Sequence, residues 1–239
     1  MKQKDLREKI AELLFRLTSY ASVLGLGGIL FFLLLKGVPP MLRYGVGDFL
    51  TGTVWHASKG EFGVFPMLLT TVLVSLGALL FAVPLGLGTA IFLHERAPQR
   101  LATLVRPGVE LLAGIPSVVY GFVGLVLLVP WLHSIFGGGG DSLFAAMFLL
   151  SVMILPTIVA TAETALAAVP KSYKEGALAL GASPMQSIFQ VQIPAAKSGI
   201  LTGIILALGR ALGETMAVIL VIGNSVALPK SLLSRGRTL

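Results

Sequence analysis

The chain has 239 residues, of which 55% are hydrophobic and 12% are charged, and its formal net charge is +7. A soluble domain carries about 25% charged and about 45–50% apolar residues, and one core of this size could not bury so much apolar surface. The composition therefore excludes an ordinary soluble protein and indicates a membrane protein. Because the positive charges lie between apolar runs, without interleaved aromatic side chains, they indicate cytoplasmic loops and not a nucleic-acid site.

Metal-binding side chains are sparse. The chain contains no cysteine, which excludes disulfide bonds and thiolate metal sites. Its three histidines, His56, His94 and His133, are scattered in expected loops or at the ends of apolar runs. We expect them to be solvated or interfacial, and we predict no metal site.

Five apolar stretches are long enough to cross a bilayer, which takes about 20 mostly apolar residues. They are expected at 17–35, 65–93, 107–132, 143–165 and 195–222. An amphipathic segment at 5–16 precedes the first and is expected to lie along the membrane surface. The first stretch is too long for a signal peptide and no cleavage site follows it, so we expect it to be retained. The expected domains are 1–62, an N-terminal cytoplasmic segment with the first span and an external loop, and 63–239, the core.

Lysine and arginine indicate the orientation, because cytoplasmic loops carry more of them. The N-terminal segment and the loops after the second and fourth stretches hold eleven, whereas the opposite loops hold three. We therefore predict a multi-pass protein with a cytoplasmic N-terminus. The C-terminal tail disagrees, because five spans place it outside although it holds Lys230, Arg235 and Arg237. We expect a further segment to follow Leu239.

Helix-breaking residues interrupt several apolar stretches. Pro84, Pro116 and Pro156 each remove a backbone hydrogen bond that lipid cannot replace, so the freed groups need a neighbouring helix or a watery cavity. The first two of these prolines are flanked by glycines, at Gly86, Gly88, Gly114, Gly121 and Gly124. About half of these proline and glycine positions are expected to be ordinary kinks and packing sites of a helical bundle. The cluster from Ala113 to Ser117 is the best candidate for a break that lines a cavity.

The loop at 169–194 predicts two short helices joined by a tight turn. Pro170 is placed to start a helix over 171–180, and Gly181 is placed to stop it. Ser183 is a suitable N-cap for a second helix, which is expected to end at Pro194. Such a compact projection with small residues on one face suits docking into a groove on a cytosolic partner.

The same loop resembles the "EAA" signature of ABC-importer permease subunits. Glu175-Gly176-Ala177, Gly181 and the run from Val191 to Pro194 meet its spacing throughout, with small or apolar replacements at Gly176, Val191 and Ile193. The resemblance implies an all-α, type I (MetI-like) transmembrane bundle with a sixth span after Leu239. It also implies that the loop docks on a separate ATPase. The contacts expected from this loop are Tyr173, Glu175, Gly176, Ala177, Gly181 and Pro194.

The chain contains no GxxxxGK[ST] phosphate-binding loop. We therefore expect a non-catalytic transport subunit with no cofactor of its own. ATP and Mg²⁺ are expected on the partner ATPase.

Charged residues within spans are costly and by default suggest function. Glu110 and Glu163 lie near span ends and are expected to extend to the interface or cap a neighbouring helix. Arg210 and Glu214 lie within the fifth stretch, four residues apart, so they share a helix face and can pair. Two interpretations stay open: an ion pair that fixes packing, or an arginine that contacts an anion in transit while the carboxylate eases release.

Two segments resemble the PstC type of phosphate-importer permease: Glu110 to Gly121, and Gly209 to Ala217. The resemblance covers about 63–224 and implies a phosphate pathway in a bacterial-type plasma (inner) membrane. The expected pathway residues are Arg210, Glu214, Thr215, Ser117 and Tyr120. The implied partners are a homologous PstA-like permease, a PstB-like ATPase dimer, a PstS-like phosphate-binding protein and membrane lipid, with no nucleic acid.

Three alternatives stay open. An ion-coupled secondary transporter of a small anion would use the intramembrane charges as a proton relay, but it would leave the cytoplasmic helix pair unexplained. An ABC permease for another oxyanion would share the same architecture. A structural or signalling membrane subunit would assemble with the ATPase without moving cargo.

Overall fold

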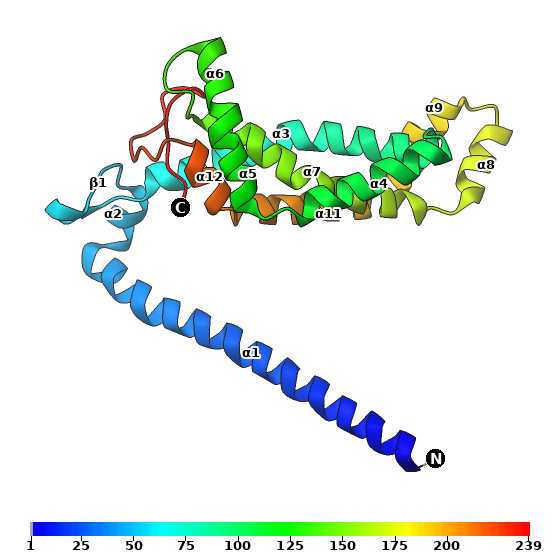
Figure 1. Ribbon diagram of the computed structural model, residues 1–239, viewed down its shortest axis with the longest axis horizontal. Helices are drawn as coiled ribbons and strands as arrows, with labels where there is room; N and C mark the ends of the chain where they lie inside the picture. The colour runs from blue at the N-terminus through cyan, green and yellow to red at the C-terminus, as the bar shows by residue number, and fades with distance from the viewer. Residues whose placement is uncertain (1) are drawn as a thin grey trace. The chain divides into compact units, whose positions relative to one another are not determined.

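The computed structural model describes residues 2–239, and the surroundings of side chains are described for 8–56 and 58–239. Most of this chain is helical (Figure 1), which confirms the predicted all-α class. Its contacts divide it into two units, one ending at Val64 and the other comprising Phe65–Leu239.

The first unit consists mainly of one long helix. Helix α1 runs unbroken over Lys2–Tyr44, which is 43 residues. That corresponds to about 64 Å at about 1.5 Å per residue, and it exceeds the roughly 30 Å hydrocarbon core of a bilayer. The sequence predicted a separate surface segment at 5–16. That division is wrong, because no break separates this segment from the apolar run.

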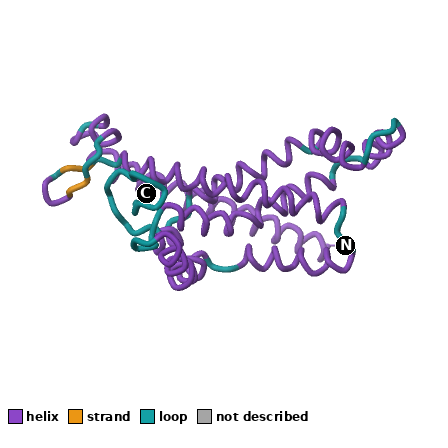
Figure 2. Tube along the Cα trace, turned by 90° about the horizontal axis from the view of Figure 1, so that it is seen from above, coloured by secondary structure: helices purple, strands orange, loops and turns teal. Residues whose placement is uncertain are grey.

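The remainder of the first unit is a short helix followed by a two-stranded hairpin. It comprises α2 (Val46–Thr51), β1 (Trp55–His56), the 3₁₀ turn η1 (Ala57–Lys59) and β2 (Glu61–Phe62). The two strands, orange in Figure 2, pair antiparallel with Trp55 opposite Phe62. The Phe62 ring packs edge to face on the rings of Trp55 and Tyr44, with centroids 5.5 and 5.6 Å apart. These contacts hold the hairpin against the end of α1.

The second unit is a bundle built around α7 (Leu143–Ala167). Helices α3 (Phe65–Glu95) and α11 (Lys197–Leu212) pack along it, and α4 (Gln99–Gly114) lies beside it (Figures 1 and 2). The most apolar part of α7 is 67% buried, against 28% for that of α3. Glycines permit the close packing, because any side chain at Gly86 would collide with Ile158 and any at Gly203 with Thr161. Helix α7 is therefore the centre of the core.

The third predicted span, 107–132, is not one helix. Helix α4 ends at Gly114, and α5 (Ser117–Val123) begins after Pro116, followed by the π-helix η2 (Gly124–Leu128) and α6 (Val129–Phe136). Proline disfavours helical backbone in the residue before it, and Ile115 is extended, with φ −69° and ψ 130°. The predicted break in the cluster from Ala113 to Ser117 is confirmed. By contrast, α3 and α7 continue through Pro84 and Pro156.

The fifth predicted span, 195–222, is also interrupted. Helix α11 ends at Leu212, and α12 (Met216–Val221) begins after Thr215. Helix α12 packs on α5, where a Cβ at Gly121 would lie 2.8 Å from the Ala217 Cα. Figure 1 shows α5 and α6 running across the direction of α3 and α7. A single continuous helix over 195–222 is therefore wrong, because the chain turns at Gly213 to bring α12 against α5.

Four of the described helical segments are long and apolar enough to cross a membrane: Glu8–Tyr44, Phe65–Glu95, Ser117–Phe136 and Leu143–Ala167. A fifth is obtained if Pro184–Ala195 and Lys197–Leu212, bent by 69°, are counted as one span. The expectation of five spans holds in this sense, with different boundaries for the third and the fifth.

The loop at 169–194 forms the helix pair that the sequence predicted. Helix α8 (Lys171–Ala179) is followed by Gly181, whose φ of +86° suits glycine at a helix C-terminus. Ser183 then starts α9 (Pro184–Gln186) through a capping box with Gln186. The helical run continues as the π-helix η3 (Ser187–Gln192) and α10 (Ile193–Ala195). The predicted end at Pro194 is therefore too early, because the bend falls at Ala196.

The residues after α12 cover the start of α7, at the end of the bundle opposite to α8. Three N–H groups there donate to carbonyl oxygens of α12 and the tail, pairing Ser142 with Val221, Leu143 with Ser234 and Phe144 with Leu232. Arg235 adds an ion pair with Asp141, with 2.8 Å between Nε and Oδ2. Helix N-termini leave such donors unsatisfied, so the tail supplies their acceptors.

Candidate functional site

Arg210 and Glu214 do not form the pair that the sequence predicted. Arg210 lies in the last turn of α11, half-buried, and its Nη1 makes a long 3.5 Å contact with Oγ1 of Thr157 on α7. Glu214 lies beyond the end of α11, so the two residues no longer share a helical face. Among the described residues, no ion pair joins them.

Glu214 instead serves the next helix. Its Oε1 accepts a hydrogen bond from the backbone N–H of Ala217, 3.0 Å away, in the first turn of α12. This turn has N–H groups without helical acceptors, and a negative charge beside it is favourable. Thr215 is exposed at the N-cap position, and its carbonyl oxygen accepts from Ile219 at 3.1 Å. The carboxylate thus stabilises the re-entry into helix after the break.

Tyr120 serves the other break in a similar way. Its hydroxyl donates to the carbonyl oxygen of Leu112, 2.8 Å away, and its side chain is buried. That carbonyl belongs to the last turn of α4, where Pro116 offers no N–H and the Ile115 N–H lies 3.4 Å away. Ser117 is the first residue of α5 and is half-buried. The hydrogen bond therefore fixes α5 relative to α4 across Pro116.

The packing of α5 on α12 brings the two breaks into one region. Four of the five predicted pathway residues flank them on α5 and before α12: Ser117, Tyr120, Glu214 and Thr215. Arg210 lies one turn before the second break and faces α7 through Thr157. In the part of the chain that the structure describes, Arg210 has no carboxylate partner. Its guanidinium N–H groups therefore remain available to donate hydrogen bonds to an anion.

The predicted contacts of the loop lie on an exposed projection. Tyr173 is 52% exposed, and Glu175, Gly176, Gly181 and Pro194 are exposed as well, with Ala177 half-buried. Further apolar side chains are exposed around them: Leu180 at 91%, together with Leu178, Met185 and Phe189. Such a cluster of exposed apolar side chains on a charged loop is typical of a protein interface.

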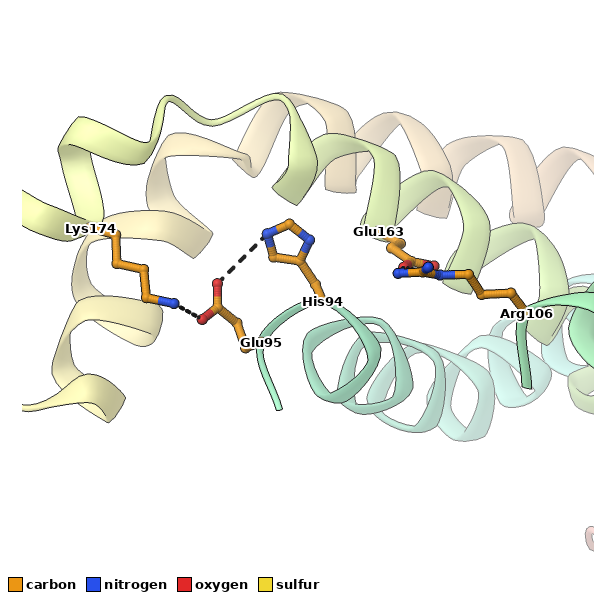
Figure 3. Close-up of polar contacts among 5 residues, drawn as sticks. All are labelled: His94, Glu95, Arg106, Glu163 and Lys174. Atoms are coloured by element: carbon orange, nitrogen blue, oxygen red, sulfur yellow. Dashed lines mark hydrogen bonds and ion pairs between the residues drawn. The ribbon is translucent and has the colours of Figure 1, made fainter. Parts of the chain in front are cut away.

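An ion-pair cluster at the foot of this projection was not predicted (Figure 3). Lys174 of α8 pairs with Glu95, the last residue of α3, and His94 Nε2 lies 3.7 Å from the other Glu95 oxygen. The side chain of Glu95 is only 5% exposed. The sequence signal for this ion pair is an acidic residue directly after an apolar run. That signal does not identify Lys174, 79 positions away, as the partner.

A second ion pair joins α4 to α7. Arg106 contacts Glu163 at 2.6 Å, through Nη2, and also donates from Nε at 2.8 Å (Figure 3). Glu163 was expected to extend to the interface or cap a neighbouring helix; its partner Arg106, which approaches from α4, was not predicted. Both donors converge on the Oε1 atom of Glu163, so the contact is charge-assisted without using the second carboxylate oxygen. Glu110, by contrast, is exposed.

The described part of the chain contains no group of three or more histidine, aspartate or glutamate side chains that could hold a metal ion. His94 lies beside Glu95, and the ring of His133 contacts the carbonyl oxygen of Gly138. Among the described residues, the candidate site comprises two backbone breaks, the Arg210 guanidinium without a carboxylate partner, and an exposed helix pair.

Broken helices within an apolar bundle are typical of membrane transport proteins. In structure the chain is similar to the inward-facing MetNI methionine ABC transporter, with 26% identity and a TM-score of 0.51, over 60% of this chain and 67% of that chain. Residues 82–237 match the family described as binding-protein-dependent transport system inner membrane component. The chain belongs to this family of ABC-importer permeases, and the predicted MetI-like fold is confirmed.

Its relatives within the family specify the type. The chain is 38% identical to the phosphate transport system permease protein PstC of Pasteurella multocida, over 96% of this chain and 79% of that protein. It is 37% identical to PstC 2 of Mycobacterium tuberculosis, over 91% and 75%. It is 43% identical to YqgH of Bacillus subtilis strain 168, named as a probable ABC transporter permease, over 88% and 70%. The predicted resemblance to PstC is confirmed.

Proposed function

We propose that this chain is the membrane-spanning permease subunit of an ATP-driven phosphate importer in a bacterial-type plasma membrane. One observation carries the proposal: relatives that cover nearly the whole chain are named as phosphate transport permeases. The N-terminus and the α8–α9 projection face the cytoplasm, which the distribution of lysine and arginine supports.

Arg210 is the proposed anion contact. Phosphate carries oxygens that suit the planar donors of a guanidinium, and Arg210 has no competing carboxylate among the described residues. Ser117, Tyr120, Glu214 and Thr215 belong to the same pathway because they flank the breaks where irregular backbone lines the bundle interior. Glu214 limits the positive potential near Arg210 without neutralising it directly, so bound phosphate can leave.

The α8–α9 projection is the proposed ATPase contact. Tyr173, Glu175, Gly176, Ala177, Gly181 and Pro194 lie on it. A PstB-like ATPase dimer would bind this chain and a homologous PstA-like permease, and ATP and Mg²⁺ would be held there. ATP binding draws together the α8–α9 projection of this chain and its counterpart in the partner permease, and it opens the phosphate pathway outward to a PstS-like phosphate-binding protein. Hydrolysis returns the pathway to an inward-facing form.

The secondary-transporter alternative is weakened by the side-chain contacts. A proton relay needs Glu110, Glu163, Arg210 and Glu214 to communicate, but Glu163 pairs with Arg106 and Glu214 bonds to backbone. Glu110 is exposed. An ABC permease for another oxyanion would fit the same contacts, so selectivity has to be measured.

The test is uptake of labelled phosphate into vesicles that contain the full set of subunits. We expect uptake that requires ATP inside, persists when the proton gradient is collapsed and is not displaced by excess sulfate. Uptake that follows the proton gradient and ignores ATP depletion would establish the secondary transporter instead. Preferential uptake of a different oxyanion would move the chain to another cargo, and assembly with the ATPase without flux would make it a structural subunit.

A further inference from the structure

Helix α8 has two different faces. One side of α8 lines a pocket of about 420 Å³ at the end of α3, through Lys171, Lys174, Glu175 and Leu178. Tyr173 and Leu180 lie on the opposite side and are exposed. One face of α8 is thus directed toward the end of α3, whereas Tyr173 on the other side borders a second pocket with residues of α7 and α11.

The pocket separates α8 from α3, so the two helices do not pack directly. His94 and Glu95 line it from α3, and Gln192 closes it from η3. Across it, Lys174 of α8 reaches Glu95 (Figure 3). In the described part of the chain, this ion pair is the side-chain hydrogen bond that joins α8 to α3. By contrast, α8 is linked to α7 and α11 through the chain itself.

The surroundings of the Lys174–Glu95 ion pair favour its remaining formed. The Glu95 side chain is 5% exposed, and a buried carboxylate without a partner is strongly unfavourable. His94 Nε2 lies 3.7 Å from the other oxygen of this carboxylate. The Lys174 side chain is 41% exposed. Its aliphatic stem crosses the pocket and places the ammonium beside Glu95.

Helix α3 can pass movement into the core. Near the same end, Ala90 of α3 belongs to one buried cluster with Ala162 and Leu166 of α7 and Ile200 of α11. Closely packed helices shift as rigid bodies and do not deform continuously. A displacement of α3 at Glu95 therefore reaches α7 and α11.

We propose that the Lys174–Glu95 ion pair is a positioning contact that makes α3 move with α8, so that ATPase docking on α8 also drives α3. This proposal rests on the proposed function, because it assigns the second route by which docking reaches the bundle. Neither residue belongs to the proposed phosphate pathway or to the proposed ATPase contacts.

The first test is the ratio of phosphate transported to ATP hydrolysed by the full complex. Lys174→Met should lower this ratio roughly fivefold or more, the lower end of ordinary coupling between sites, while assembly is retained. Lys174→Glu combined with Glu95→Lys should restore it. The matched control is Arg106→Met, which breaks a comparable ion pair between α4 and α7 and should leave the ratio unchanged. A wild-type ratio in Lys174→Met, or an exchanged pair no better than the single variants, overturns the proposal.

The second test does not depend on the cargo. Because the chain has no cysteine, Ser172→Cys on α8 and Phe92→Cys on α3 can be spin-labelled selectively before assembly. We expect one narrow distance distribution that does not change between nucleotide-free and ATP-bound complex, and that broadens in Lys174→Met. A wild-type distance that changes with ATP, or no broadening in Lys174→Met, overturns the ion-pair proposal. Absence of ATP-dependent phosphate uptake by the wild type would refute the proposed function and leave this measurement to decide on the ion pair.

Discussion

Glu214 offers the sharpest test of the geometry around the second break. If its carboxylate caps α12, Glu214→Gln keeps the acceptor for the Ala217 N–H and loses only the charge. A charge near a helix N-terminus contributes about 0.3–1 kcal/mol, so we expect a loss of unfolding free energy in that range. Glu214→Ala removes the acceptor as well and should cost about 1–2 kcal/mol in total. An ion pair with Arg210 would make the two substitutions equally costly.

The assay is unfolding of the detergent-solubilised chain by sodium dodecyl sulfate in mixed micelles, followed by circular dichroism. Glu110→Gln and Glu110→Ala are matched controls, because Glu110 is exposed, and both should be nearly neutral. A double-mutant cycle with Arg210→Gln measures the coupling directly. Equal losses for Glu214→Gln and Glu214→Ala, or a coupling energy above about 0.5 kcal/mol between Arg210 and Glu214, would refute the capping role.

Three further outcomes are expected. Glu175→Lys should weaken ATPase binding in a pull-down and separate hydrolysis from uptake, whereas coupling at the wild-type level would contradict its place in the interface. Arg210→Ala should abolish phosphate uptake while the complex still co-purifies, and normal uptake would remove the anion contact. Gly181→Ala should destabilise the turn by about 1–2 kcal/mol, because a side chain is disfavoured at its φ of +86°; unchanged protease resistance of the loop would count against this.

The features that local sequence encodes were predictable. Gly181 stops α8 because a positive φ favours glycine, and Ser183 starts α9 because its hydroxyl accepts the N–H of Gln186, 3.2 Å away. Both signals act within four residues, so no tertiary information is needed to see them. The same holds for the break at Pro116. The apolar runs likewise predicted the helical bundle, because lipid requires the backbone to satisfy itself.

Tertiary contacts decided what the sequence could not. Gly213, Glu214 and Thr215 interrupt the apolar pattern directly after Leu212, but a glycine within an apolar run is equally compatible with a continuous span. The packing of α12 on α5 accompanies the end of α11 at this point. Because α11 ends between Arg210 and Glu214, their i, i+4 spacing no longer places them on one helical face. Pro156 also lies within an apolar run, yet α7 continues through it, with Pro156 buried in the packed bundle. Lys174 and Glu95 are simply too far apart in the chain to be paired by inspection.

The basic C-terminal tail, which disagreed with the charge rule, acquires a structural reason. Arg235 pairs with Asp141, and the tail supplies acceptors to the first N–H groups of α7. The charge rule counts lysines and arginines in short loops near the spans, and the first span usually dominates. Arg235 fixes the fold locally at the end of the bundle opposite to α8. The proposed orientation therefore depends on the lysines and arginines near α1, α4 and α8, and not on the sum over the chain.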